Sequence, residues 1–351
     1  MSEVKNFGDT EASKAADVNL GDAPKKAAPV NMIQSLNWAL HDAMEADANV
    51  IVFGEEIADP EGGGIVKISS GLSTKYGNRV RSTPISEMGF MGAAVGAAVV
   101  GFKPVVEIML MNFVAVCMDQ ITNHAAKLRF MSGGQTHVPM VIRTMTGSGF
   151  QNGGQHSDFL EAWFCHTPGI KVVMPSNPAD GYGLLRSAID DEDPVLFIEH
   201  LNNYWTPGAA PERGKKIPLG KARIHRPGKD VTVIGYSRSM LDIPPVVEKL
   251  AKEGIDCEVI DLRTVQPMDM DTILTSVKKT GRAVIVHEAC RSFGVGAELS
   301  SRIHEALFRE LKAPVERVAS EDCPVPYAPP LEAAYLYTHA ELEASIRKTL
   351  A

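Results

Sequence analysis

The chain has 351 residues, 44% of them hydrophobic and 22% charged, which is the composition of a globular protein and suggests two domains. The net charge of −8 and the lack of a basic run exclude nucleic acid and anionic membrane surfaces as main partners. Five scattered cysteines, with no C-x-x-C pair among them, favour a reducing compartment, and we expect the protein to be cytoplasmic.

Residues 1–30 have neither the apolar core of a signal peptide nor any arginine, so we expect a disordered tail. Helical and extended patterns alternate after it. Helices are predicted over 32–47, 88–102, 112–131 and 177–191, and strands over 49–54, 103–110, 138–144, 170–175 and 194–200. Short strands rich in valine and isoleucine between helices indicate a parallel sheet covered on both faces.

Prolines and glycines crowd residues 206–228, which we interpret as an interdomain linker. Alternation resumes beyond it, with strands expected over 231–236, 256–262 and 282–288 and helices over 241–254, 270–281, 296–311 and 340–350. The predicted fold class is therefore α/β with two domains, a larger one over 31–205 and a smaller one over 229–351.

A single carboxylate, Glu87, stands directly before an uncharged run, Met88–Phe102, which is shorter than the roughly 20 residues that a membrane-spanning helix needs. An acid in the first turn of a helix capped by Ser86 would explain Glu87. Alternatively, the glycines of the run let another backbone approach closely, and the half-buried acid then needs a donor such as a ligand ring nitrogen.

Two loops carry further candidates. His156 follows the glycine-rich stretch "GSGFQNGGQHSDF", where a histidine suits proton transfer, although a mobile surface loop is an equal alternative. Glu55 and Glu56 come directly after a buried strand, and the carboxyl ends of parallel strands are where sites form. A solvated acidic turn is the simpler interpretation of that pair.

Several common motifs are missing. No G-x-G-x-x-G follows a strand, no G-x-x-x-x-G-K-[ST] occurs, and no G-x-S-x-G occurs. His287-Glu288 does not extend to H-E-x-x-H because Arg291 stands at the last position. A dinucleotide dehydrogenase, a P-loop enzyme, an α/β-hydrolase and a zinc site are all disfavoured.

Ordered blocks from about Met32 to Leu350 resemble a known family, among them "VFGEEIA", "TPISEMGFMGAAVGAA", "MDQITNHAAKLRFMSGG", "GGQHS", "VIVHEACRSFGVGAE" and "PVPYAPPLE". They are similar to the β subunit of the thiamine-diphosphate-dependent decarboxylase component of 2-oxo acid dehydrogenase complexes. The resemblance implies a pyrimidine-binding domain followed by a transketolase-type C-terminal domain.

The resemblance also implies roles for individual residues. Glu87 would hydrogen-bond a nitrogen of the cofactor's aminopyrimidine ring, and sharing a proton there favours the ring tautomer that activates the thiazolium carbon. Glu55 would relay protons between two cofactor sites. Phe113 would pack near the pyrimidine, and His156 would assist the substrate or acyl-transfer step.

Metal binding follows from the resemblance as well. Family members bind K⁺ largely through backbone carbonyls, and the matching positions are Met140, Ala188, Asp191 and Asp193. The G-D-G motif that holds Mg²⁺ and diphosphate occurs here only as "GDT" and "GDA" in the tail. We therefore expect an α subunit to hold Mg²⁺, in an α₂β₂ heterotetramer that is inactive without it.

The expected reaction is decarboxylation of a 2-oxo acid on thiamine diphosphate and transfer of the acyl group to a lipoyl-bearing acyltransferase. The Gln155-His156 pair resembles the pyruvate and acetoin branches rather than the branched-chain one, although Asp158 replaces the usual glutamine of Q-H-S-Q. We expect pyruvate as the substrate, with acetoin cleavage as the alternative. A non-catalytic interaction subunit would not require Glu87 and His156. A self-sufficient transketolase-like enzyme would need the missing G-D-G motif.

Overall fold

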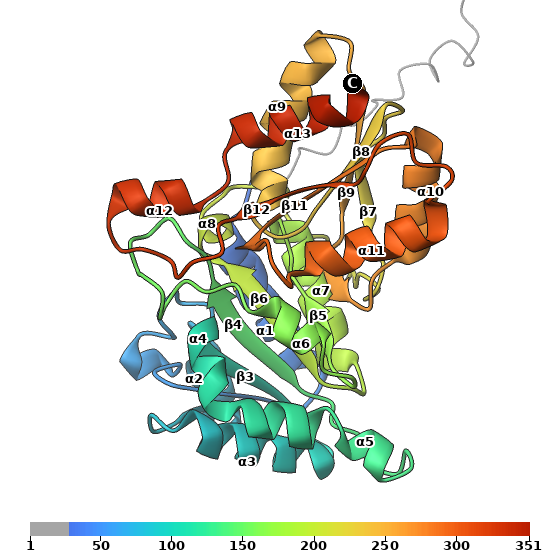
Figure 1. Ribbon diagram of the computed structural model, residues 1–351. Helices are drawn as coiled ribbons and strands as arrows, with labels where there is room; N and C mark the ends of the chain where they lie inside the picture. The colour runs from blue at the N-terminus through green and yellow to red at the C-terminus, as the bar shows by residue number, and fades with distance from the viewer. Residues whose placement is uncertain (1–27) are drawn as a thin grey trace, which may run out of the picture.

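The structure, a computed structural model, describes residues 28–351 as two α/β domains, one above the other (Figure 1). The predicted tail, residues 1–30, falls outside this range except at its end, where Val30 pairs with Gly208. The predicted α/β class with two domains is confirmed.

The first domain is built on a seven-stranded sheet in the order β10-β5-β6-β4-β3-β1-β2. Its strands are β1 (Val50–Gly54), β2 (Val80–Ser82), β3 (Lys103–Leu110), β4 (Val141–Thr146), β5 (Lys171–Val173), β6 (Val195–His200) and β10 (Thr264–Gln266). All pairs are parallel except that β10 runs antiparallel to β5. Because β10 comes from the second half of the chain, both domains contribute to this sheet.

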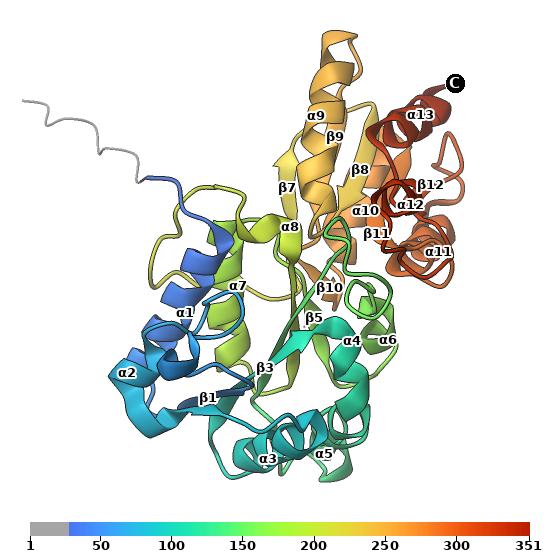
Figure 2. The same ribbon diagram turned by 90° about the vertical axis from the view of Figure 1, so that its left-hand side faces the viewer.

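Helices cover both faces of that sheet. They are α1 (Met32–Ala46), α2 (Leu72–Tyr76), α3 (Glu87–Val99), α4 (Met111–Val114), α5 (Leu128–Met131), α6 (Glu161–Cys165), α7 (Pro178–Asp190) and α8 (Leu201–Tyr204). One apolar cluster joins α1 and α7 to one face, and another joins α3 and α6 to the opposite face (Figure 2). Asn31 starts α1 with a capping box, since its side chain and that of Gln34 each accept the other's backbone N–H.

The second domain has a five-stranded sheet in the order β12-β11-β8-β9-β7. The strands are β7 (Arg223–Arg226), β8 (Val231–Gly235), β9 (Cys257–Asp261), β11 (Ala283–Cys290) and β12 (Glu316–Ser320). The helices are α9 (Ser239–Lys252), α10 (Met270–Thr280), α11 (Val295–Leu307), α12 (Pro329–Tyr335) and α13 (His339–Leu350). β7 lies inside the predicted linker, where it pairs antiparallel with β9 along the edge of the sheet.

The two domains are joined by more than the linker. A single apolar cluster contains Phe164 of the first domain together with Ile234 and Ile285 of the second. Across the same boundary, the Tyr236 hydroxyl donates to Glu161 at 2.7 Å. Burial of continuous apolar surface fixes the orientation of one domain against the other.

The prediction of one long helix over 112–131 is wrong. The segment is divided into α4, a 3₁₀ turn, a π-helix at Gln120–Ala125 and α5. Thr122 is one cause, because its hydroxyl donates to the carbonyl of Met118 at 2.8 Å and competes with the helical backbone bond. The N–H of Ala126 bonds Ile121, five residues back, at 2.9 Å.

Candidate functional site

The four strongest sequence candidates follow the carboxyl ends of four neighbouring strands. Glu55 comes after β1, Glu87 after β2 and Phe113 after β3, while His156 lies in the loop after β4. These strands are adjacent and parallel in the order β4-β3-β1-β2. The topology therefore brings all four residues to one edge of the sheet, where ligands bind in open parallel α/β sheets.

Glu55 and Glu87 form an acidic pair at this edge. Glu55 is 7% exposed, and its Oε1 atom has no hydrogen-bond partner within the described residues. Burial, followed by repulsion from Glu87 and Glu56, raises the pKa of Glu55, against the opposing effect of the Ser86 N–H. Glu87 is half-buried as the first residue of α3, and Ser86 makes no side-chain cap there. Ser86 therefore adds no side-chain cap, whereas Glu87 lies in the first turn of α3, where an acid is favoured by the helix dipole.

Phe113 and His156 form the second pair. Their rings meet edge to face, with centroids 5.4 Å apart, and the Nδ1 atom of His156 is buried without a partner within residues 28–351. Asn112 holds the two segments together, because its Nδ2 donates to Gly154 O at 3.0 Å and to Asp158 Oδ2 at 2.8 Å. Burial raises the pKa of Asp158, which Asn112 partly offsets.

The outer face of α3 is small and uncovered. Gly89, Ala93 and Gly96 are exposed at helical spacing, and a side chain at Gly96 would meet no atom within 4 Å. Within residues 28–351 no helix combines the length and hydropathy needed to cross a bilayer. Exposed backbone of this kind permits close approach of another polypeptide.

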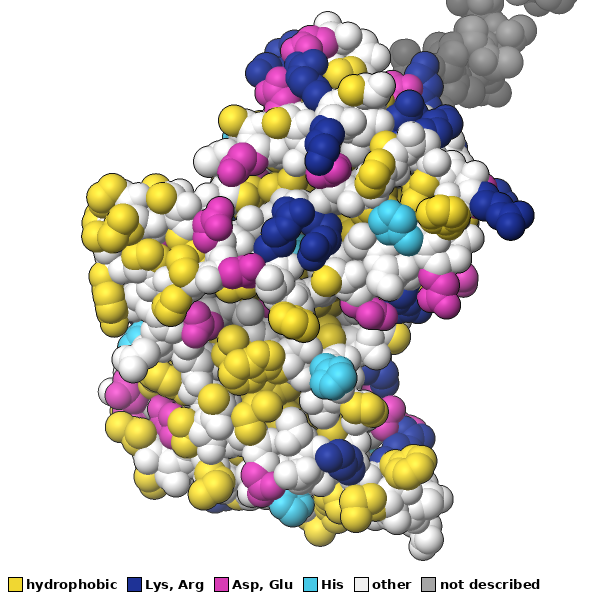
Figure 3. Space-filling model, in the orientation of Figure 1, with side chains coloured by type: hydrophobic (Ala, Val, Ile, Leu, Met, Phe, Trp, Pro, Cys, Tyr) yellow, Lys and Arg dark blue, Asp and Glu magenta, His cyan; other side chains and the backbone are white. Residues whose placement is uncertain are grey.

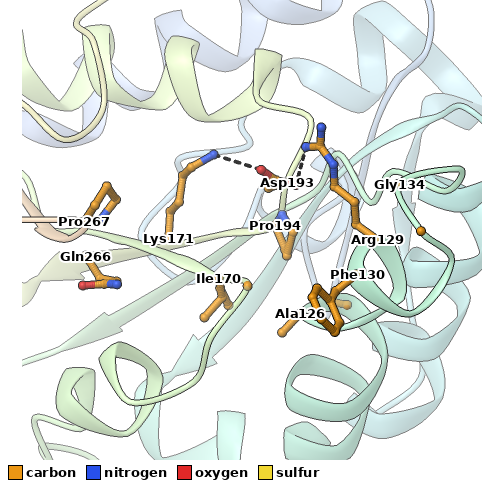
Figure 4. Close-up of a pocket in the computed structure, with 13 residues that line it drawn as sticks. Ala126, Arg129, Phe130, Gly134, Ile170, Lys171, Asp193, Pro194, Gln266 and Pro267 are labelled. Atoms are coloured by element: carbon orange, nitrogen blue, oxygen red, sulfur yellow. Dashed lines mark hydrogen bonds and ion pairs between the residues drawn. The ribbon is translucent and has the colours of Figure 1, made fainter.

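Three of the residues matched to K⁺ binding, Ala188, Asp191 and Asp193, lie where α7 ends and β6 begins, and Met140 directly precedes β4. Ala188 O accepts the N–H of Asp191 at 3.3 Å, and Met140 O accepts the N–H of Val195 at 2.9 Å. The side chain of Asp193 pairs with Arg129 at 2.7 Å and Lys171 at 3.3 Å, beside a cavity of about 620 Å³ (Figure 4). In the described part of the chain, no group of three His, Cys, Asp or Glu side chains is arranged to hold a metal ion.

Three residues that reach the site region were not singled out from the sequence. They are Asn112, already described, and two acids of the second domain, Glu288 and Glu332, which accept backbone N–H groups of the glycine-rich loop. Glu288 and Glu332 lie in the blocks "VIVHEACRSFGVGAE" and "PVPYAPPLE". The resemblance of those blocks to the family could have drawn attention to the two acids. The sequence does not indicate, however, that they contact a loop of the other domain.

Comparisons with known proteins agree with this architecture. Residues 28–206 match the transketolase pyrimidine-binding domain, and residues 220–342 match the transketolase C-terminal domain. A solved structure described as a split-gene transketolase, an inactive β4 tetramer, has a TM-score of 0.75 at 20% identity, covering 92% of this chain and 98% of that one. At that identity the likeness concerns the fold alone.

Sequence relatives are closer. The β subunit of acetoin:2,6-dichlorophenolindophenol oxidoreductase from Cupriavidus necator is 44% identical over 90% of this chain and 96% of its own length. The pyruvate dehydrogenase E1 β subunit from Rhizobium meliloti is 42% identical over 93% of this chain and 71% of its own. The chain therefore belongs to the family of β subunits of thiamine-diphosphate-dependent 2-oxo acid and acetoin dehydrogenases.

Proposed function

We propose that this chain is the β subunit of a 2-oxo acid dehydrogenase that decarboxylates pyruvate and passes the acyl group to a lipoyl-bearing acyltransferase. The observation that carries the proposal is the convergence of Glu55, Glu87, Phe113 and His156 at adjacent strand ends of a pyrimidine-binding domain. This chain would form its half of the site at that edge.

The residues at the edge fit an aminopyrimidine ring. The orphaned Oε1 of Glu55 and the half-buried Glu87 leave acceptor atoms available to ring N–H groups, and Phe113 offers an aromatic surface. When bound, thiamine diphosphate would supply a carbon nucleophile and an electron sink for the bond cleavage.

Two of these side chains, Glu87 and Glu55, would hold or move a proton, and His156 would orient a reactant. Glu87 would share a proton with the ring nitrogen that it faces. Burial and the charge of Glu87 raise the pKa of Glu55, which would make that carboxyl a better proton carrier than an exposed glutamate. The free Nδ1 of His156 would orient the oxo acid or the lipoyl thiol.

Metals enter this proposal in two places. Mg²⁺ would be held with the diphosphate mainly by the α subunit, since the only G-D sequences of this chain are in its first 30 residues and lack the motif. K⁺ would be held by backbone carbonyls at Met140, Ala188, Asp191 and Asp193. The pairing of the Asp193 side chain with Arg129 and Lys171 leaves that role to its carbonyl.

The partners follow from the same reasoning. An α subunit would complete the site in an α₂β₂ heterotetramer, and the uncovered glycine face of α3 offers it a close contact. We propose a cytoplasmic location on cysteine usage. The relatives include mitochondrial β subunits, for example that of Dictyostelium discoideum at 43% identity.

Acetoin cleavage is the second candidate. Two relatives that carry the acetoin name, from Cupriavidus necator and Bacillus subtilis, are 44% and 40% identical to this chain, as close as the pyruvate enzymes. The test is to assay the reconstituted αβ pair with pyruvate, branched 2-oxo acids and acetoin, using an artificial electron acceptor. Turnover of acetoin alone would replace pyruvate in the proposal.

The same assay separates the remaining rivals. Turnover by the isolated β chain with thiamine diphosphate would indicate a self-sufficient transketolase-like enzyme. Full activity of an αβ pair in which both Glu87 and His156 are replaced would indicate a non-catalytic β chain. We expect neither outcome.

A further inference from the structure

The glycine-rich loop that carries His156 is fastened by a buried acid of the other domain. Glu332 of α12 is 3% exposed, and its Oε1 accepts the N–H of Gly149 at 2.7 Å and that of Gln151 at 3.2 Å. Its Oε2 also accepts the N–H of Gln151, at 3.1 Å. One carboxylate thus fixes two backbone positions of a loop that lies more than 180 residues away in sequence.

The loop backbone at these positions is unusual. Gly149 has φ +102 and Gln151 has φ +59, in the left-handed region that a glutamine seldom adopts. The N–H groups of Gly149 and Gln151, two residues apart, both donate to the Glu332 carboxylate. Glu332 thus stabilises a loop conformation that would otherwise be costly.

Two further contacts extend the fastening toward both ends of the loop. Glu288 of β11 accepts the N–H of Ser148 at 2.7 Å and bonds His200 Nε2 at 2.8 Å. Tyr327 lies over Gly153, where a Cβ atom would stand 2.2 Å from the ring. The second domain therefore holds the loop from residue 148 to residue 153, three residues before His156.

Apolar side chains gather on the surface over α12 (Figure 3). Among them, Leu331 and Tyr327 are 58% and 61% exposed. Glu332 is the buried acid of the same short helix. The Glu332 carboxylate points inward and bonds the loop, whereas the neighbouring Leu331 side chain is exposed on the surface. Glu332 is therefore placed to position the loop rather than to contact a partner.

We propose that Glu332 is a positioning residue, which sets the place of His156 by holding the loop backbone at Gly149 and Gln151. The inference rests on the proposed role of His156 in the reaction. It adds that the second domain, through one carboxylate, helps to set where that histidine stands, together with Asn112 of the first domain, which bonds Gly154 and Asp158 on either side of it. A displacement of about 1 Å can reduce turnover by about a hundredfold, so the effect should be measurable.

The test uses Glu332→Ala and Glu332→Gln in the αβ complex. For Glu332→Ala we expect hydrogen exchange at the Gly149 and Gln151 amides to accelerate at least about tenfold, and kcat with a lipoyl acceptor to fall about 10–100-fold while KM changes little. Glu332→Gln keeps one acceptor oxygen and should restore part of both losses. Unchanged exchange, or faster exchange with unchanged kcat, would overturn the proposal.

A double substitution distinguishes positioning from general damage. In a His156→Ala background, Glu332→Ala should reduce kcat no further, because the side chain to be positioned is gone. A further loss of about tenfold or more would overturn the proposal. If His156→Ala alone retains wild-type turnover, the role given to His156 fails, whereas loop exchange in Glu332→Ala still reports separately on the fastening.

Glu258 provides a matched control. It is a buried acid of the same domain that accepts the N–H of Gly228 at 3.2 Å and a hydroxyl proton from Ser276. Glu258→Ala should lower the melting temperature of the complex without accelerating exchange at Gly149 and Gln151. If Glu332→Ala does not fold, Glu332→Leu, which keeps the bulk of the side chain but has no acceptor atom, takes its place, and wild-type exchange at Gly149 and Gln151 in that variant would refute the proposal.

Discussion

Two groups of buried acids in the first domain differ in how their charges are satisfied. At the centre of the sheet, Arg143 of β4 donates two bonds of 2.7 Å to Glu199 of β6 and one of 2.7 Å to Glu107 of β3. The Tyr204 hydroxyl adds a bond of 2.6 Å to Glu199. Burial raises the pKa of Glu199, and Arg143 opposes that effect.

At the strand ends, Glu55 and Glu87 have no arginine between them, and Glu55 keeps an acceptor atom unused. The comparison shows that burial alone does not mark a site. The central acids are satisfied within the chain and serve its stability, whereas Glu55 at the strand ends keeps an unused acceptor, which we propose is satisfied by a partner from outside. The predictions below test that distinction.

Removing the arginine from the central cluster of Arg143, Glu199 and Glu107 should have the largest effect on stability. Arg143→Met leaves two carboxylates buried without a counter-charge, and we expect a loss of about 3–5 kcal/mol in the free energy of unfolding, measured with urea. Arg129→Met is the control, because its pair with Asp193 is partly exposed and should contribute only about 0–1 kcal/mol. Equal losses from both would contradict the distinction.

Glu87→Gln should reduce turnover and leave stability nearly unchanged, the opposite of what we expect for Arg143→Met. We expect turnover of the αβ complex to fall by about 10²–10⁴-fold, because a proton-sharing carboxylate is lost, while the melting temperature stays nearly constant. Glu305→Gln, which changes an exposed acid of α11, should leave turnover intact. Lipoyl-dependent turnover near wild type in Glu87→Gln would show that the role proposed for Glu87 is wrong.

Glu161 sharpens the comparison, because it is buried at the boundary between the domains with an unused Oε2 atom, while its Oε1 accepts the Tyr236 hydroxyl. Burial raises its pKa to about 7, and the Tyr236 hydroxyl partly opposes this. The folded chain thus binds a proton that the unfolded chain releases at lower pH, so stability falls as pH rises from about 5 to about 7, at most by about 1.4 kcal/mol per pH unit.

Glu161→Gln should flatten that part of the stability profile, as measured by urea unfolding between pH 5 and pH 8. A profile that stays as steep as that of the wild type would mean that another group is responsible. The expected result would show that a proton, rather than a ligand, can satisfy an unpaired buried acid.

The smallest effect on stability is expected for Glu55→Gln. Since repulsion and burial raise the pKa of Glu55, its ionised form is unfavourable in the folded chain, and the substitution should stabilise the chain by less than about 1 kcal/mol at pH 8. Thermal unfolding at pH 5 and pH 8 measures this. A marked loss of stability at pH 8 would place Glu55 with the central acids instead.

The sequence was sufficient for features that depend on local patterns. The alternation of apolar runs and helical periods located α1, α7 and α13, and the acid before the glycine run marked the start of α3. Sequence similarity to a known family, rather than periodicity, singled out Phe113 and supplied the roles of His156 and Glu87. Those roles remain predictions.

Features that depend on distant contacts were not predictable. β10 has only three residues and forms because the edge of β5 accepts it, so no local signal distinguishes it from a turn. The π-helix arises where the hydroxyl of Thr122 takes a backbone carbonyl, a competition that apolar periodicity does not register. Glu332 meets the glycine-rich loop only after both domains have folded.

The sharing of a sheet between domains has a consequence for synthesis on the ribosome. The first domain emerges with one edge of β5 unpaired, since β6 pairs only the other edge, and the segment that covers it, Thr264–Gln266, follows about ninety residues later. At about 5–20 residues per second, that edge stays open for several seconds. An open strand edge can pair with another chain, so slow codons between the two segments should lengthen the interval in which nascent chains can associate there.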